Sequence, residues 1–316
     1  MNKVAKTVLK LAAGTAVAYL AVGEGIYERL LNRKFTQFNN LSRVVEPDIL
    51  KFYDKDANYI EADAWYVTMN PEDTVLVNSK GKNMHARILM QNEYSDKWAV
   101  VIHGYTSCSR GMADQAFFFY KKGFNVILPD LVSFGEDEQK YCSMGYHDKD
   151  YIKDWIRFIV DKDSSAKIAL LGVSMGSATT MLTTGEPDIP DNVKCAVADC
   201  GYTSVWDEYS IQCKETYKLP AFPFMHAANT VSKLRGNFDF KKCSPIKAVS
   251  RSKIPTLFIH GEEDTFVPYF MMDKLYNACT AEKEKLSIPG TAHADSCWTQ
   301  PELYYSSIDK FVNKYI

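Results

Sequence analysis

A serine flanked by glycines is the strongest chemical signal in the sequence. Residues 172–176 read Gly-Val-Ser-Met-Gly, so that Ser174 stands at the centre of a G-x-S-x-G motif. The motif follows an apolar run at residues 167–172 and precedes a segment with helical spacing, and this strand–turn–helix context makes it informative. Glycines allow a tight turn, and the N-terminal end of the helix would favour an anion forming beside the serine. The pattern predicts that Ser174 is a nucleophile.

A serine hydroxyl needs a base within hydrogen-bonding reach, and the sequence contains six histidines. His293 lies in a loop between the last predicted strand and the last predicted helix, and parallel α/β proteins build their sites from loops at the carboxyl ends of strands. We therefore predict that His293 is the base. His226, in a long interval between two strands, is the alternative. The remaining histidines precede a strand-end glycine, lie in a hairpin or begin a helix: His85, His103, His147 and His260.

The third group should be a carboxylate that orients the imidazole and stabilises its protonated form. Three acids follow the buried run at residues 255–261, and Asp264 is favoured because the turn at the strand end would carry it beyond that end. Asp199, at the end of the preceding predicted strand, is the alternative. The chain order of the three predicted groups is then Ser174, Asp264, His293.

A regular alternation of strands and helices must position these groups. Residues 74–78 and 84–90 are extended runs on either side of a turn-rich segment, which predicts an antiparallel hairpin. Apolar runs then alternate with segments of helical spacing, which predicts parallel βαβ units in a doubly wound, mostly parallel sheet of about eight strands. The further predicted strands are residues 98–103, 125–129, 167–172, 195–199, 255–261 and 285–289, and the helices are residues 111–121, 148–160, 174–184, 269–279 and 302–315.

One interval, at about residues 202–253, breaks this alternation. It is longer than a simple crossover requires and too rich in aromatic side chains for a flexible linker. We predict a helical cap over the site. Trp206 and Phe224 in this cap, together with Phe266 beyond it, are candidate residues of a substrate pocket. The cap belongs to one domain at residues 74–316, and residues 35–73 are expected to connect to this domain and pack on its core.

The N-terminal segment, residues 1–34, has the layout of a targeting sequence. Lys3, Lys6 and Lys10 precede an uncharged, Ala-rich run at residues 11–22. A membrane span needs about 20 residues, so this run is short for one. A cleavable signal, an uncleaved membrane anchor and a helix that packs on the domain stay open. The expected location is extracytoplasmic or membrane-anchored, with the cytoplasm as the alternative.

Composition excludes several classes of protein. The 316 residues are 46% hydrophobic, and 37 Lys+Arg against 39 Asp+Glu give a net charge of −2. These values are typical of a globular protein, and without a basic run nucleic acid is not an expected partner. The eight cysteines contain no C-x-x-C pair, so a zinc ribbon is not expected. One disulfide is possible but is not predicted, and most of the cysteines are expected to be buried as small apolar residues. No cofactor or metal motif occurs, and the oligomeric state is not indicated.

The order of the three groups on this strand pattern resembles the α/β-hydrolase fold family over about residues 74–316. Residues 103–107 read His-Gly-Tyr-Thr-Ser, which makes the chain most similar to bacterial, often surface-associated serine hydrolases of the esterase and peptidase branch. The resemblance implies that the backbone N–H groups of Tyr105 and Met175 form an oxyanion hole. Many relatives carry Arg-Gly-His-Gly-x-Ser after the fourth strand, whereas residues 130–136 read Asp-Leu-Val-Ser-Phe-Gly-Glu, so the family's hydrogen bonds in that loop are not carried over.

Together these features predict a serine hydrolase that cleaves a carboxylic ester through an acyl-enzyme, without a cofactor or metal. An amidase or exopeptidase that uses the same Ser174, Asp264 and His293 is the alternative. A non-catalytic binding protein of the same fold is a third possibility, but it would be favoured by a missing member of the triad and none is missing. The expected partner is a small-molecule ester or amide.

Overall fold

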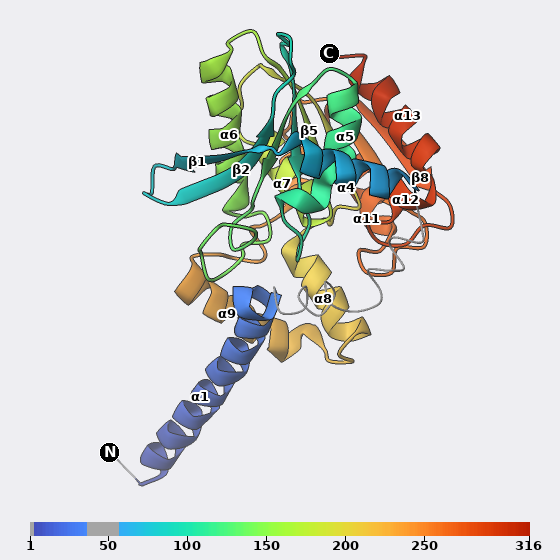
Figure 1. Ribbon diagram of the computed structural model, residues 1–316. Helices are drawn as coiled ribbons and strands as arrows, with labels where there is room; N and C mark the ends of the chain where they lie inside the picture. The colour runs from blue at the N-terminus through green and yellow to red at the C-terminus, as the bar shows by residue number, and fades with distance from the viewer. Residues whose placement is uncertain (1–2, 37–56) are drawn as a thin grey trace.

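The computed structural model describes residues 3–36 and 57–316 (Figure 1). Its centre is an eight-stranded sheet with the order β1-β2-β4-β3-β5-β6-β7-β8. β1 and β2 form an antiparallel hairpin, β2 pairs antiparallel with β4, and all other neighbours are parallel. The strands are Glu72–Val77 (β1), Asn83–Leu89 (β2), Lys97–Ile102 (β3), Asn125–Pro129 (β4), Lys167–Val173 (β5), Val193–Asp199 (β6), Thr256–Gly261 (β7) and Lys283–Ile288 (β8). The predicted mostly parallel sheet is confirmed.

The strands follow from how much of each is covered. β4 is buried along its whole length and β3 along nearly all of it, which explains their unbroken apolar sequences. β1 and β8 lie at the edges, and their side chains are mostly exposed or half-buried. In β5, Ile168 and Leu170 pack on one face of the sheet while Ala169 and Leu171 pack on the other. Such two-sided burial requires helices on both faces.

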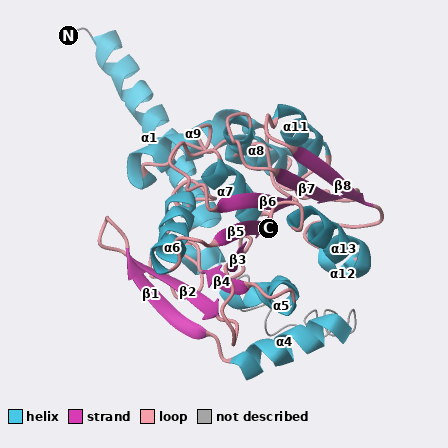
Figure 2. Cartoon of the chain, turned by 90° about the horizontal axis from the view of Figure 1, so that it is seen from above, coloured by secondary structure: helices cyan, strands magenta, loops and turns pink. Residues whose placement is uncertain are grey.

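Helices cover both faces, as Figure 2 shows. One face carries Asp148–Lys162 (α6), Met175–Thr184 (α7), Pro245–Val249 (α10) and Phe270–Ala278 (α11). The other carries Ala113–Lys121 (α5), Ser296–Thr299 (α12) and Pro301–Val312 (α13), with Ala57–Met69 (α4) packed on α5. α4 lies in the segment predicted to connect to the domain, of which residues 37–56 are outside the described part.

The interval predicted as a cap contains two longer helices, Val205–Glu215 (α8) and Ala221–Gly236 (α9), followed by α10. Figure 1 shows α8 and α9 side by side, below the sheet and its flanking helices. The interval begins directly after the carboxyl end of β6, and β5, which the G-x-S-x-G motif follows, runs parallel to β6. The interval therefore lies on the side where a site at the strand ends would open.

The N-terminal helix, Lys3–Leu31 (α1), packs on α9 with its C-terminal part, while its N-terminal part projects away from the body (Figure 1). The two helices meet closely at Gly23, where an added methyl group would lie 2.4 Å from the backbone oxygen of Ala227. Arg235 of α9 pairs with Glu24 and with Glu28 of α1. The buried part of α1 begins at Gly23, whereas residues 12–22 of the Ala-rich run are exposed except for the half-buried Tyr19.

The prediction of a membrane anchor in residues 1–34 receives no support. Among the helices of the described residues, none is both long enough and apolar enough to cross a membrane. The Ala-rich run is only weakly apolar, and it continues without a break into the charged stretch that contacts α9. All eight cysteines lie within the described residues, and their thiols are free.

Candidate active site

Ser174 stands at the turn between β5 and α7. Its backbone has a φ of 56° and a ψ of −114°, a conformation that is strained for a residue with a side chain. Two close approaches explain the flanking glycines: a methyl group would lie 2.2 Å from the oxygen of Gly176 if placed on Gly172, and 2.1 Å from the oxygen of Ile102 if placed on Gly176. The turn is therefore pressed against β3, and it holds Ser174 at the end of the sheet.

The structure brings the three predicted groups together. The imidazole Nε2 of His293 lies 2.9 Å from Ser174 Oγ, and its Nδ1 lies 2.7 Å from Asp264 Oδ2. The hydroxyl can donate to Nε2 while Nδ1–H donates to the carboxylate. The side chain of Asp264 is fully buried, whereas that of His293 is 21% exposed. Such a chain of hydrogen bonds can move a proton away from the serine oxygen.

Asp264 is held from two sides. Its Oδ1 accepts hydrogen bonds from the backbone N–H groups of Phe266, at 3.0 Å, and Val267, at 2.8 Å. Its Oδ2 faces His293 and also lies 3.1 Å from Nε2 of His260, which donates to the oxygen of Val267. Burial alone would raise the pKa of Asp264, but the hydrogen bonds from His260 and His293 outweigh it and lower the pKa below its usual value. The carboxyl is therefore ionised at neutral pH.

Asp199 and His226, the two alternatives from the sequence, do not take part in this series of hydrogen bonds. Asp199 accepts a hydrogen bond from Ser296 Oγ at 3.4 Å, and burial raises its pKa to about 6. The imidazole of His226 packs edge-on against Trp206 at 4.9 Å between ring centroids, within the α8–α9 segment. His293 forms the hydrogen bond with Ser174, and Asp264 forms the hydrogen bond with His293.

The two residues predicted for an oxyanion hole flank the serine. Met175 is the first residue of α7, where backbone N–H groups have no partner inside the helix. Tyr105 follows Gly104, whose position is so close to the serine turn that a methyl group there would lie 3.4 Å from Ser174 Cβ. His103 holds this segment in place. Its Nδ1 donates to the oxygen of Gly104 at 2.8 Å, and its Nε2 accepts from the N–H of Leu131, in the loop after β4, at 3.0 Å.

Of the three candidate pocket residues, Phe266 lies beside the base. Its ring centroid is 5.0 Å from that of His293, and nearly half of its side chain is exposed. Trp206 packs under the ammonium of Lys241 at 4.1 Å, and Phe224 packs half-buried on the main core. An apolar surface for an acyl group is thus present at Phe266, while Trp206 and Phe224 contact other parts of the cap and the core.

One group of three potential metal ligands occurs among the described residues: Cys200, Asp264 and His293, with ligand atoms within 4.8 Å of one another. Two of these side chains already bind each other directly. Burial, together with the nearby carboxylates, raises the pKa of the Cys200 thiol well above its usual value, so the thiolate that a metal requires is disfavoured. The cluster is explained by the acid–base pair rather than by a metal.

A residue that the sequence pattern did not single out lies on α8. Glu208 is only 2% exposed, and neither of its carboxylate oxygens accepts a hydrogen bond of normal geometry from a described residue. Burial raises its pKa to about 8, and the nearby charge of Asp264 adds to the shift. Gln212, one turn later, acts in the opposite direction, but its Nε2 donates to the backbone oxygen of Phe266 at 2.6 Å.

Replacing Glu208 with Gln should stabilise the fold at alkaline pH. The pKa of Glu208 is about 8 when folded against 4.5 when exposed, so between these values the unfolded chain binds fewer protons than the folded chain. The free energy of unfolding of the wild type then falls as the pH rises, by up to about 5 kcal/mol. Gln cannot ionise and escapes this loss. Urea unfolding at pH 5 and pH 9 should show that the stability of Glu208→Gln relative to wild type grows with pH. The same difference in stability at both pH values would contradict the raised pKa of Glu208.

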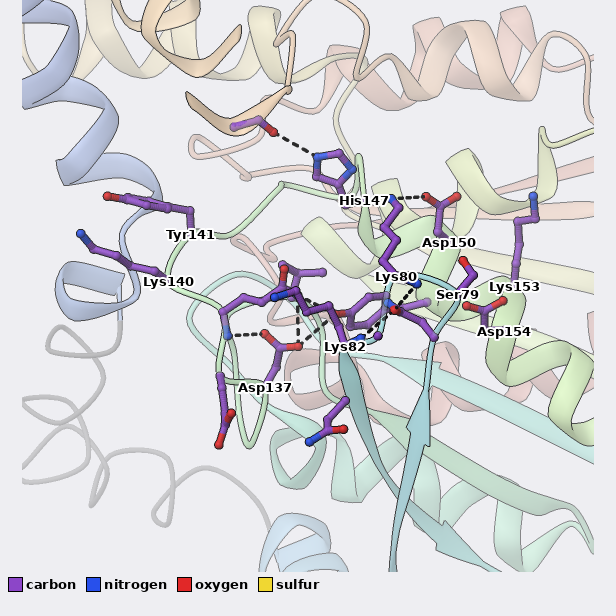
Figure 3. A pocket seen from close by; sticks show the side chains of 18 of the residues that line it. Ser79, Lys80, Lys82, Asp137, Lys140, Tyr141, His147, Asp150, Lys153 and Asp154 are labelled. Atoms are coloured by element: carbon purple, nitrogen blue, oxygen red, sulfur yellow. Dashed lines mark hydrogen bonds and ion pairs between the residues drawn. The ribbon is translucent and has the colours of Figure 1, made fainter. Parts of the chain in front are cut away.

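A separate pocket of about 930 Å³ lies between the β1–β2 turn, the loop after β4 and α6 (Figure 3). Several of its charged side chains form ion pairs, either with one another or with residues outside the lining. Lys80 Nζ lies 3.9 Å from Asp150 Oδ2, and Lys153 Nζ lies 2.6 Å from Asp188 Oδ1. Ser174 does not line this pocket. Its place and its paired charges give it no part in the chemistry of the serine.

Comparisons with known proteins bear on the fold of the chain. A family model described as alpha/beta hydrolase fold matches residues 98–218. The Bacillus subtilis uncharacterized protein YqkD is 25% identical over 215 residues, which cover 68% of this chain and 70% of YqkD. The Arabidopsis thaliana alpha/beta hydrolase domain-containing protein WAV2 is 26% identical over 197 residues, 60% of this chain and 61% of WAV2.

Solved structures share the architecture. The Pyrococcus furiosus esterase Pf2001 superposes with a TM-score of 0.62 at 20% identity, over 79% of this chain and 94% of that esterase. The Pyrococcus horikoshii acylaminoacyl peptidase does so with a TM-score of 0.55 at 17% identity, over 77% of this chain and 40% of the peptidase. The sheet order, the serine at its strand–helix turn and these matches agree, and the chain has the alpha/beta hydrolase fold.

Proposed function

We propose that the chain is a serine hydrolase that cleaves a carboxylic ester through an acyl-enzyme. The hydrogen-bonded series Ser174 Oγ, His293 and Asp264, with contacts of 2.9 and 2.7 Å, is the observation that carries the proposal. Chance proximity of three such groups at the ends of three different strands is a poor explanation for this series. The similarity to proteins of the alpha/beta hydrolase fold supports a hydrolase in general.

The reaction would proceed in two halves. Ser174 Oγ attacks the acyl carbonyl while His293 Nε2 takes its proton, and the ionised Asp264 stabilises the imidazolium that results. The N–H groups of Tyr105 and Met175 would donate to the oxyanion, an interaction whose loss typically costs ~10²–10³ in rate. The imidazolium then protonates the departing alcohol. In the second half His293 activates water, which releases the acid and restores the serine.

A fluorophosphonate probe tests the nucleophile directly. It should label the folded chain at one residue, and peptide mapping should identify Ser174. Esters and anilides that share one acyl group then test the leaving group, and we expect the p-nitrophenyl ester to be hydrolysed with the higher kcat/KM. Labelling of another residue, or no labelling together with no hydrolysis, would refute the proposal. A faster anilide reaction would retain the nucleophile and replace the ester by an amide.

A further inference from the structure

Glu208 is a buried acid that the proposed reaction does not use. It is 2% exposed, and neither of its oxygens has a hydrogen-bond donor of normal geometry among the described residues. A buried polar group without a partner carries its full desolvation cost, and such groups are rare in folded proteins. α8 could have placed an apolar side chain here at no such cost. The carboxyl therefore calls for an explanation beyond packing.

The carboxyl lies on the face of α8 that contacts the loop after β7, which contains Asp264 and Phe266 and is called the acid loop below. Glu208 and Gln212 are one helical turn apart and share a face. Gln212 Nε2 donates to the oxygen of Phe266 at 2.6 Å, and the ring of Phe266 packs on His293 at 5.0 Å. One step along the helix therefore separates Glu208 from the loop that holds Asp264. Figure 1 shows α8 below the sheet, on the same side as α9.

No positively charged side chain of the described residues acts on the charge of Glu208. The groups that interact with its charge are Asp264 on the acid loop and Tyr202 and Tyr209 on its own segment, all of them acids. Gln212 is the neutral neighbour. Asp264 is ionised, and Glu208 adds a second negative charge within its electrostatic reach when it too ionises, in a region of low dielectric where an opposite charge is strongly attracted. What this arrangement lacks is a positively charged hydrogen-bond donor.

We propose that Glu208 binds a primary ammonium group of the substrate, so that the site accepts acyl groups that carry an amine. An ammonium has three donors, enough for both carboxylate oxygens, and its charge favours the ionised carboxylate. The inference rests on the proposed function, because it assigns a substrate class to the site at Ser174. It also gives the cap a role in substrate binding, which α8 performs through Glu208.

Protonation adds a second signature. The pKa of Glu208, about 8, leaves the carboxyl mostly neutral in the free chain at neutral pH. Binding of an ammonium would release that proton, so the preference for a cationic acyl group should grow as the pH rises from about 6.5 to 8.5. The pH profile is measured with the 6-aminohexanoyl ester, whose alkyl amine has a pKa near 10 and stays charged over this range, whereas the α-amine of a glycine ester, with a pKa of roughly 8, does not. A neutral hydrogen-bonding role for Glu208 would give the opposite trend.

The test compares acyl groups of equal shape. The 4-methylumbelliferyl esters of glycine, β-alanine and 6-aminohexanoic acid each pair with an ester in which methyl replaces the ammonium: propionate, butyrate and heptanoate. Hydroxyl analogues form a third set. For the best-fitting length, wild type should favour the ammonium over the methyl group by about tenfold or more. Glu208→Gln should bring this ratio to about 1 and leave kcat/KM for the methyl ester within about threefold.

Glu215→Gln is the matched control, since it removes the same charge from an exposed position of α8 and should leave the ratio unchanged. Fluorophosphonate labelling of Glu208→Gln checks that the serine and the fold are intact. Absence of an ammonium preference at all three lengths, equal preference for the hydroxyl analogue, or an undiminished ratio in Glu208→Gln would each overturn the inference. The proposed function fails separately, if the methyl esters themselves are not hydrolysed at Ser174.

Discussion

Ser174→Ala should lower kcat for p-nitrophenyl butyrate by on the order of 10⁶ and abolish labelling by a fluorophosphonate. The substitution removes the hydroxyl oxygen that lies 2.9 Å from the imidazole Nε2 of His293. The backbone at this position is already in a strained conformation, and alanine tolerates it no worse than serine. The fold should therefore remain intact. Circular dichroism and thermal unfolding would verify this next to the kinetic measurement.

Ser177→Ala is a suitable control on the same helix. Ser177 is fully buried and its Oγ has no hydrogen-bond partner in the described chain, so its loss should change kcat by less than about threefold. A Ser174→Ala variant that kept more than about 1% of the wild-type activity would place the nucleophile elsewhere. Loss of activity in both variants would point to damage to α7 rather than to loss of a nucleophile.

Asp264→Asn should lower kcat by about 10⁴ with little change in KM. The backbone N–H groups of Phe266 and Val267 donate to Oδ1, so the amide oxygen of an asparagine would be kept at that position. Its NH₂ group would then occupy the place of Oδ2 and face Nδ1 of His293. Nδ1 would have to accept this hydrogen bond, which puts the proton on Nε2. An imidazole in that tautomer cannot take the proton of Ser174.

Asp199→Asn separates this effect from a general loss of negative charge. Asp199 also lies at the end of a strand and is buried, but its hydrogen bond is with Ser296. We expect kcat of this variant to stay within about tenfold of wild type. A larger loss in Asp199→Asn than in Asp264→Asn, measured with the same ester, would make Asp199 the functional acid.

The sheet could be predicted from the sequence because its strands are covered on both faces. Two-sided burial leaves an unbroken apolar run such as that of β4, and such runs in alternation with helices have few other arrangements. The positions of Asp264 and His293 follow from the same regularity, since both lie just beyond a strand end. The family resemblance added the oxyanion residues.

Features that depend on packing between distant segments could not be predicted. The contact of α1 with α9 is an example, because the close approach of Gly23 to Ala227 and the ion pairs of Arg235 join segments about 200 residues apart in the sequence. Glu208 left no signal in the sequence for a related reason. Whether an acid on α8 faces solvent or the acid loop depends on how the helix is rotated, and that is set by contacts such as Gln212 with Phe266.

Because α1 and α9 cross tightly, we expect the N-terminal helix to move together with the cap. A straight helix of 29 residues is about 43 Å long, and its far end projects from the body (Figure 1). With no room between the backbones at Gly23, a tilt of α9 must tilt α1 by a similar angle, and the distance along the helix multiplies the displacement at its tip. A spin label near Ala12 would therefore report small rotations of the cap from a place where the label itself touches nothing in the site.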